Sequence, residues 1–504
     1  MMKRTCAAAA AAVLLGCSVA SAADLRIGLW DNPDAIDPTM GRLYSGRIIL
    51  NMVCDKLFDI TPDLKIVPVL ATGYTVSDDG KQMTINIRKG VKFHDGDVMD
   101  AKAVKYTLER HIKMPGSMRK SELDVIDSVE VVDPQTVRLK LKQPSAPLLA
   151  HLTDRAGMVI SPRAADSLGD KFGNQPVCTG PFKMTSRPAR DQIILERFGD
   201  YWAKDKIHID RVVLTPIPDG TVRVSNLRAG QLDLIERVSP QDVGALKSAS
   251  NIAMASIPEL GYQVITFNVA NGEKANTPLG KDARLREAFD LAIDRNVIAK
   301  VVFQGIFVPG SQYVSPSNFF FNPAFPVPKR DLAKAKKLMA EAGHKRYALT
   351  LMTANDPDWI QAAQIIQSMV AEAGFDMKIE VQENATRSKR MKAGDFDVGF
   401  SFWSGRSDPD GNIGNRAICD APNNDSGYCN KLLDELLRKA REAPKPEDRR
   451  PYYHKAPEML GKDRPMIFVW HRSVITAFNK KVTGFAQYPD GLFRLQGMRV
   501  GAKP

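Results

Sequence analysis

Between residues 331 and 403 the chain alternates helix patterns with strand patterns, and this alternation restricts the possible folds more than any other feature of the sequence. Asp331 is placed to cap a helix that ends at Gly343, and Asp356, followed by Pro, is placed to cap a second helix that ends at Gly374. Apolar side chains alternate, as they do in strands, at 347–351, 375–381 and 396–402. Single helices between successive strands imply parallel pairing with right-handed crossovers, so we predict an α/β fold.

Residues 74–141 have a different pattern, which predicts an antiparallel α+β unit. Asp78-Asp79-Gly80 and Asp133-Pro134 each separate two stretches of alternating apolar residues, as hairpin turns do. Between these hairpins, Asp100 is placed to cap a helix that runs to about His111. Because no low-complexity linker separates the regions with these two patterns, we expect packed lobes that are joined by short crossing segments.

The first 22 residues resemble an export signal. A basic start precedes an apolar run at 7–15, and residues 20–22 (Ala-Ser-Ala) are the small residues that a signal peptidase recognises. The run is too short to span a bilayer as a permanent helix. We therefore predict cleavage before Ala23 and a periplasmic protein. Leu14-Leu15-Gly16-Cys17 also resembles a lipoprotein box, so lipidation of Cys17 is the competing interpretation.

The positive charge of the chain does not predict a nucleic-acid partner. Lys and Arg number 70 against 58 Asp and Glu, which gives a net charge of +12. The densest basic stretch, 387–392, contains no interleaved aromatic residue, and we interpret it as a solvated helix face. With 44% hydrophobic and 25% charged residues the composition is that of an ordinary soluble protein. We expect a monomer whose charge reflects its compartment or an acidic docking surface.

Export favours disulfides among the four cysteines that follow the signal. Four cysteines allow three connectivities. Cys419 and Cys429 enclose nine residues rich in Pro, Asn and Gly, a loop that closes easily, and their pairing leaves Cys54 with Cys178. Four reduced thiols are the alternative. Zinc binding is disfavoured because no two cysteines have the C-x2–4-C spacing.

Motifs that carry catalysis are missing from the sequence. It contains no G-x-S-x-G, H-E-x-x-H or G-x-x-x-x-G-K-[ST] motif, and its seven His residues are scattered. Residues 408–412 resemble the start of a calcium loop but lack Gly at the sixth and Glu at the twelfth position. We therefore predict neither catalysis nor a bound metal or cofactor. A secreted hydrolase is a remote alternative, since no nucleophile, base and orienting group occur together.

Two loops that follow strands predict a ligand site. In open α/β sheets, ligands bind beyond the carboxyl ends of the strands. A carboxylate beside a ligand ammonium forms a charge-assisted hydrogen bond, worth roughly 1.5–3 kcal/mol. Asp408 and Asp410 offer carboxylates after the strand that ends at Trp403, although capping the next turn is an equally supported role for both. The other candidates from these two loops are Arg406, Asn32 and Tyr44.

Short motifs along the whole chain carry a family resemblance. In order, they are Ser77–Gly80, Ile87–Gly96, Thr179–Phe182, Asp200–Trp202, Gly230–Asp233, Arg284–Arg295, Ala335–Gly343, Gly394–Asp397, Trp403 and Asp408–Asp410. Each motif alone is weak. Together, and in this order, they resemble the extracellular solute-binding proteins of family 5, which are the dipeptide-, oligopeptide- and nickel-type receptors of ABC importers.

The resemblance implies a two-lobe clamshell, the large type II form of periplasmic binding proteins. Lobe I would comprise 23–266 and 482–504, with an extra α+β subdomain at about 56–178, and lobe II would comprise 267–481. The implied function is the capture of a peptide or peptide-like solute between the lobes for delivery to a membrane permease.

The resemblance also implies roles for the candidate residues. In dipeptide receptors of this family, an Asp after the strand-end Trp holds the ligand ammonium, and Asp408 matches this position best. Trp403 would pack against the ligand and Arg406 would meet a carboxylate. The stretch 355–364 lacks the Arg that dipeptide receptors use for the ligand carboxylate, so Arg406 or Arg387 is the substitute. Glutathione, an opine or a metal chelate is therefore the alternative ligand.

The cysteines fit the same family. A Cys pair that encloses a loop after the ligand-binding Asp resembles Cys419 and Cys429. Cys178 occupies a position where the family usually has Gly, which supports a further bridge to Cys54.

Overall fold

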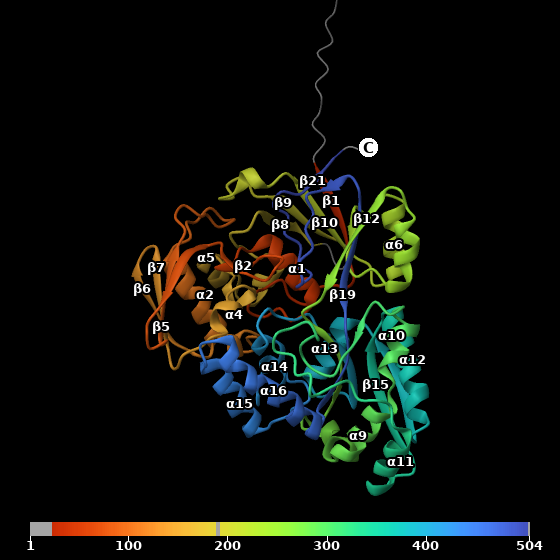
Figure 1. Cartoon of the computed structure of the whole chain (residues 1–504). Helices are drawn as coiled ribbons and strands as arrows, with labels where there is room; N and C mark the ends of the chain where they lie inside the picture. Colours follow the sequence, from red (N-terminus) through yellow and green to blue (C-terminus); the bar gives the residue numbers. More distant parts are fainter. Residues whose placement is uncertain (1–22, 188–191, 502–504) are drawn as a thin grey trace, which may run out of the picture.

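The computed structural model describes residues 23–187 and 192–501 and consists of two lobes, each built on its own sheet (Figure 1). The predicted export signal at 1–22 lies outside the described residues. Among the described residues, none of the helices combines the length and apolar composition that crossing a membrane requires.

Lobe I is built on a seven-stranded mixed sheet with the order β12-β19-β11-β1-β10-β9-β8. The central strand β1 pairs in parallel with both β10 and β11. The strands are β1 (Asp24–Leu29), β8 (Phe182–Ser186), β9 (Ile193–Arg197), β10 (Arg211–Pro216), β11 (Leu234–Ile235), β12 (Ile252–Pro258) and β19 (Ser473–Asn479). The helices are α1 (Tyr44–Val53), α5 (Pro162–Leu168), α6 (Gly220–Arg228) and α7 (Val243–Lys247). Two small strand pairs are β2 (Phe58–Ile60) with β3 (Ile66–Pro68), and β20 (Val482–Thr483) with β21 (Arg499–Val500).

The predicted antiparallel α+β unit is confirmed as a subdomain of lobe I, at the left of Figure 1. Its sheet has the order β4-β5-β7-β6, with β4 (Ala71–Val76), β5 (Gln82–Ile87), β6 (Ile126–Asp133) and β7 (Thr136–Leu141). Helix α2 (Ala101–Lys113) begins where predicted, because Asp100 accepts hydrogen bonds from the backbone N–H groups of Lys102 and Ala103. Short helices α3 (Lys120–Leu123) and α4 (Leu148–His151) follow.

Lobe II is built on a six-stranded sheet with the order β14-β18-β13-β17-β15-β16. As predicted, β15 (Tyr347–Ala354), β16 (Phe375–Gln382) and β17 (Val398–Trp403) are parallel. The sheet is mixed, because β13 (Tyr262–Phe267) runs antiparallel between β17 and β18 (Met466–His471), and β14 (Val308–Pro309) runs antiparallel to β18. The helices are α8 (Pro278–Lys281), α9 (Ala283–Ala292), α10 (Arg295–Val301), α11 (Leu332–Glu341), α12 (Pro357–Ala371), α13 (Asn384–Lys392), α14 (Asp410–Ala417), α15 (Lys431–Glu442) and α16 (Pro446–Asp463).

The chain crosses between the two sheets at 259–261 and at Arg472, rather than at 266 and 481 where the sequence placed the lobe boundaries. Strand β13 belongs to the sheet of lobe II, and β19 belongs to the sheet of lobe I. The apolar pattern of β13, which is buried along its whole length, suits a central strand of either sheet. The identity of its partners is therefore not encoded locally.

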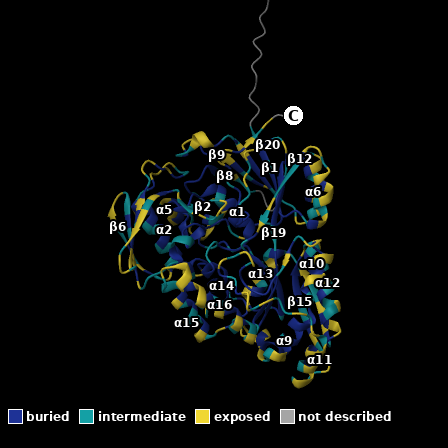
Figure 2. Ribbon diagram, viewed as in Figure 1, coloured by how far each residue is buried: buried dark blue, intermediate teal, exposed yellow. Residues whose placement is uncertain are grey.

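Both predicted disulfides are present, between Cys54 and Cys178 and between Cys419 and Cys429. The first joins the end of α1 to the segment before β8 inside the core of lobe I. The second closes the loop between α14 and α15. Figure 2 shows the buried positions in the interior of both lobes and exposed positions on outer helices such as α6, α11 and α15.

Candidate ligand-binding site

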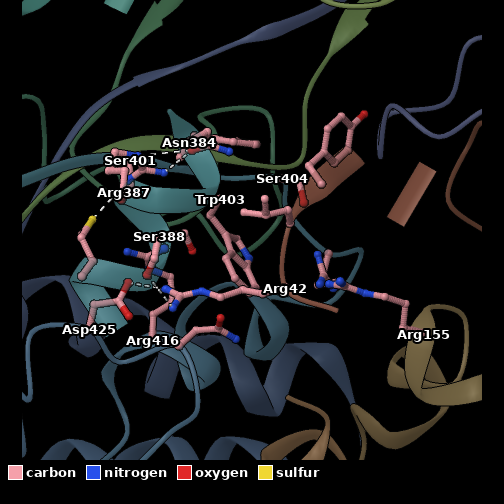
Figure 3. Close-up of a pocket in the computed structure, with 16 residues that line it drawn as sticks. Arg42, Arg155, Asn384, Arg387, Ser388, Ser401, Trp403, Ser404, Arg416 and Asp425 are labelled. Atoms are coloured by element: carbon pink, nitrogen blue, oxygen red, sulfur yellow. Dashed lines mark hydrogen bonds and ion pairs between the residues drawn. The ribbon is translucent and has the colours of Figure 1, made fainter. Parts of the chain in front are cut away.

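A cavity of about 60 Å³ lies where the two lobes meet (Figure 3). Lobe I contributes the segment before α1, with Arg42, and the short turn that holds Arg155. Lobe II contributes one face of α13, the end of β17, helix α14 and the loop closed by the Cys419–Cys429 disulfide. The cavity therefore lies beyond the carboxyl end of β17, where the sequence predicted a ligand site.

A wider groove of about 720 Å³ adjoins this cavity and shares Arg42, Leu43 and Ser388 with it. The groove lies between the loop that follows β1 and the exposed side of α13. Its charged lining comprises Asp34, Arg42, Arg187, Glu383, Lys389 and Lys392. The cavity and groove together run from the interior of the interface to the molecular surface.

Polar contacts hold the lobes closed around the cavity. Arg42 of lobe I pairs with Asp425 of lobe II. Nε of Arg406 lies 2.7 Å from Oδ2 of Asp154 across the same boundary. A third bridge is the hydrogen bond of 2.6 Å that the side chain of Asn384 donates to Asp31. These contacts show that the two lobes are in a closed arrangement.

The cavity is strongly cationic. Five guanidinium groups line it, and Asp425 provides its single lining carboxylate among the described residues. Two of the five have carboxylate partners, since Arg42 pairs with Asp425 and Arg406 pairs with Asp154. The remaining three make no ion pair with a carboxylate in the described parts of the chain. They are Arg155, Arg387 and Arg416.

Helix α13 holds Arg387 in the wall of the cavity, where the residue is only 4% exposed. Its Nη2 donates a hydrogen bond of 2.6 Å to Oδ1 of Asn384, and its Nη1 donates one of 3.2 Å to the carbonyl oxygen of Phe400. Burial, aided by the nearby charge of Arg42, lowers the pKa of Arg387 to about 10. The charges of Asp425 and Asp31 favour the charged form of the guanidinium but do not offset the effect of burial.

Arg416 and Arg155 each have a buried nitrogen atom without a hydrogen-bond partner among the described residues. Nη2 of Arg416 donates a hydrogen bond of 3.3 Å to Thr266, while its Nε has no partner among the described residues. Nη1 of Arg155 donates to the carbonyl oxygen of Gly41 at 2.8 Å, and its Nε is likewise without a partner there. Burial, together with the charge of Arg119, lowers the pKa of Arg155 well below its ordinary value.

Three of the predicted binding residues line the cavity. Trp403 stands at the end of β17, and the guanidinium of Arg406 lies 4.9 Å from the centre of its ring. Tyr44 also lines the cavity, with its hydroxyl group 3.4 Å from the carbonyl oxygen of Asp490. Asn32 lines the adjoining groove.

Asp408 and Asp410 lie outside this lining, contrary to their predicted place in the site. Arg449 holds Asp408 through two hydrogen bonds of 2.6 and 2.8 Å. Asp408 also accepts a bond from the backbone N–H of Asp410 at the start of α14, which is the capping role named as the alternative. Asp410 pairs with Arg441 at 2.7 Å and with His151 at 3.3 Å. Neither carboxylate is free for a ligand in this arrangement.

The interpretation of 387–392 as a solvated helix face is wrong for three of its members, one of which is Ser388, buried and in the cavity lining. Arg387 and Met391 are buried and line the cavity, whereas Lys389 is exposed at the groove. The stretch is basic on average, and this composition gave no indication that one face of α13 is buried. Sequence reasoning also missed further lining residues, because single Arg and Asp residues at distant positions leave no local signal. These are Arg42, Arg155, Arg416 and Asp425.

Comparisons with known proteins match nearly the whole chain. The family model described as bacterial extracellular solute-binding proteins, family 5 Middle, matches residues 65–424. The glutathione-binding protein GsiB of Salmonella paratyphi A is 29% identical over 484 residues, which cover 93% of each chain. The structure of DppA from Helicobacter pylori in complex with the peptide STSA is 27% identical, with a TM-score of 0.87, and the match covers 95% of this chain and 98% of that one. The structure of AgaA from A. tumefaciens R10 in complex with agropinic acid is 25% identical, with a TM-score of 0.85, over 95% of this chain and 99% of that one.

Proposed function

Since the chain belongs to family 5 of the bacterial extracellular solute-binding proteins, the solute receptors of ABC importers, we propose that it captures an anionic, peptide-like solute between its lobes for delivery to the permease. The solute is bound and released without chemical change. The periplasmic location, monomeric state and absence of a nucleic-acid partner remain predictions from the sequence.

The observation that carries this proposal is the set of three buried guanidinium groups that form no ion pair with a carboxylate in the described parts of the chain. Removing a charge from water is costly unless an opposite charge or hydrogen bonds replace the lost hydration. Arg155, Arg387 and Arg416 have some hydrogen bonds but form no ion pair with a carboxylate among the described residues. Carboxylates of a ligand would supply that charge, and the planar guanidinium group binds them in a bidentate manner.

Closure is the second element of the proposed mechanism. A ligand favours the closed state only by the contacts that it makes there and not in the open state. The cavity is formed by both lobes, so Arg42 and Arg155 can meet the same ligand as Arg387 and Arg416 only after a hinge motion. The crossings at 259–261 and Arg472 are the two connections about which such a hinge turns.

Among peptide-like solutes, this reasoning favours those with a net negative charge. A dipeptide with neutral side chains carries one carboxylate and one ammonium group, and so has no net charge. Glutathione, which the name of the Salmonella relative specifies for that protein, carries two carboxylates and one ammonium group. An opine acid, as in the complex of the A. tumefaciens protein, is the second candidate. A metal chelate is supported only if it carries a net negative charge.

Titration calorimetry with matched probes tests the proposal. Glutathione, alanyl-glutamate and agropinic acid represent anionic solutes, and alanyl-alanine and alanyl-lysine are the neutral and cationic controls. We expect anionic probes to bind at least tenfold more tightly than alanyl-alanine, and alanyl-lysine to bind more weakly still. Equal affinity for the three alanyl dipeptides would contradict the proposal.

A further inference from the structure

The predicted anchor for a ligand ammonium, Asp408, is occupied by Arg449, which leaves the cationic group of a peptide-like ligand without an assigned partner. We propose that Asp425, on the disulfide-closed loop after α14, receives the ligand ammonium. The inference rests on the proposed function, because it adds a specific residue to the same ligand site.

The loop that carries Asp425 is fixed at both its ends and its middle. The Cys419–Cys429 disulfide joins its ends, with the two Cα atoms 4.4 Å apart. The side chain of Asn271 donates a hydrogen bond of 2.9 Å to the carbonyl oxygen of Asp425. The carbonyl oxygen of Ser426 accepts two backbone hydrogen bonds, of 3.0 and 2.9 Å, from the segment that follows β13. Asp425 is therefore held in one place relative to the sheet of lobe II.

Only one of the two carboxylate oxygens of Asp425 accepts a hydrogen bond from a described residue. Its Oδ2 accepts a hydrogen bond from Arg42 of the opposite lobe. Its Oδ1 is buried and has no hydrogen-bond donor among the described residues. The residue is 3% exposed and lines the cavity. A buried carboxylate oxygen without a donor is costly, and a ligand ammonium group would supply both a donor and an opposite charge.

The positive charges around Asp425 favour a ligand whose ammonium group lies next to a carboxylate. Figure 3 shows Asp425 joined to Arg42 and on the same side of Trp403 as Arg387, while Arg155 lies on the other side in this view. An isolated cation would be repelled by these guanidinium groups. An α-amino-acid end carries its ammonium and carboxylate on one carbon, so it can meet Asp425 and an arginine together. The N-terminal glutamyl residue of glutathione has such an end.

The test compares probes that differ only in the amino group. Glutathione is paired with its des-amino analogue, glutaryl-cysteinyl-glycine, and γ-glutamyl-glycine is paired with glutaryl-glycine. Calorimetry on the whole protein gives the affinity ratio within each pair. Because a charge-assisted hydrogen bond is lost with the amino group, we expect the wild type to prefer the amine-bearing member of a bound pair by about 10–100-fold.

Two variants separate contact with the ammonium from closure of the lobes. Asp425→Asn removes the charge and also weakens the bridge to Arg42, so it lowers the affinity for every probe. Arg42→Gln breaks the same bridge but leaves the carboxylate. We expect the preference for the amine-bearing member to fall to about twofold or less in Asp425→Asn and to persist in Arg42→Gln. Thermal unfolding of both variants checks that they are folded.

The outcomes distinguish this inference from the proposed function. Tight binding of both members of a pair by the wild type, or a preference that persists in Asp425→Asn, overturns the role of Asp425 while leaving anion capture intact. Failure of every anionic probe to bind contradicts the proposed function and the inference with it.

Discussion

Arg406 and Asp154 meet across the boundary between the lobes, with Nε of the arginine 2.7 Å from Oδ2 of the aspartate. Arg47, from the same lobe as Asp154, contacts the other carboxylate oxygen at 2.9 Å. Burial alone would raise the pKa of Asp154, but Arg406 and Arg47 hold it well below its ordinary value. One buried carboxylate therefore bridges an arginine from each lobe.

Removing this carboxylate is expected to destabilise the closed protein. Asp154→Asn leaves Arg47 and Arg406 buried without their shared counter-charge, and breaking a buried pair in this way costs about 3–5 kcal/mol. Denaturant unfolding in the presence of saturating ligand measures the loss. Asp63→Asn is the control, because the pair of Asp63 with Lys65 is exposed and should contribute little. An equal effect of the two substitutions would contradict this prediction.

Arg387 and Arg416 are expected to select the charge of the ligand. Arg387→Gln and Arg416→Gln should each weaken binding of an anionic probe about 10–100-fold, because each removes a charge-assisted hydrogen bond. Binding of alanyl-alanine should change much less. Lys389→Gln is the matched control, since Lys389 is exposed at the groove. A loss that is the same for neutral and anionic probes would indicate a structural role only.

Ligand affinity is expected to depend on pH through His151 of lobe I and Asp410 of lobe II. Burial lowers the pKa of His151, but the hydrogen bond and charge of Asp410, with Glu122 and Asp408 nearby, raise it above its ordinary value overall. Arg441 also contacts this carboxylate. A raised pKa in the closed state means that the contribution is complete below about pH 6.5 and is lost as the pH rises through the closed-state pKa.

Affinity should therefore fall as the pH rises above about 6.5, and closure should take up a proton. Calorimetry in two buffers of different ionisation enthalpy measures that uptake. His151→Gln should flatten the pH profile and abolish the uptake. An unchanged profile in this variant would assign the pH dependence to another group.

Asp55 is expected to make folding stability fall as the pH rises. Burial raises its pKa to about 7, although Trp202 donates a hydrogen bond of 2.7 Å to it and Tyr201 one of 3.3 Å. The protonated form is favoured in the folded state, so the contribution is complete below about pH 4 and is lost as the pH rises through 7.

Asp55→Asn removes the charge and keeps an acceptor for Trp202. The free energy of unfolding of this variant relative to the wild type should increase from pH 5 to pH 8, by about 1–4 kcal/mol. Urea unfolding across this range provides the measurement. A difference that does not vary with pH would show that Asp55 does not titrate there.

The two disulfides are expected to contribute differently to stability and to ligand affinity. Cys54 and Cys178 are 124 residues apart, so replacing both with Ser should cost about 5 kcal/mol of stability through loop-closure entropy. Cys419 and Cys429 are 10 residues apart, and the corresponding cost is about 3 kcal/mol. Ligand affinity should fall more in the second double variant, because its loop positions Asp425. Equal affinities in the two folded variants would contradict that assignment.

Elements that are determined by neighbouring residues could be predicted closely. Helix α12 begins at Pro357 because Asp356 accepts a hydrogen bond of 3.0 Å from the backbone N–H of Trp359, as the sequence indicated. The placement of β13 could not be predicted, because both sheets offer a buried central position to an apolar strand. Its partners are fixed only when the lobes are assembled.

The same contrast holds in the candidate site. Trp403 was located from the strand that it ends, which is local information. The position of Asp408 in the chain suggested a free carboxylate, yet its partner Arg449 stands 41 residues later on α16. Arg387 was named as a possible partner of the ligand carboxylate but also placed on a solvated helix face, because the sequence did not show that only one face of α13 is buried. Pairing of charges across the fold therefore decides which predicted residues remain available to a ligand.

Native mass spectrometry of the protein purified from its own cells or from a rich medium tests the central claim most directly. The account predicts a co-purifying solute that carries a net negative charge and is lost from the Arg387→Gln, Arg416→Gln double variant. A neutral or cationic solute that both forms of the protein retain equally would contradict it.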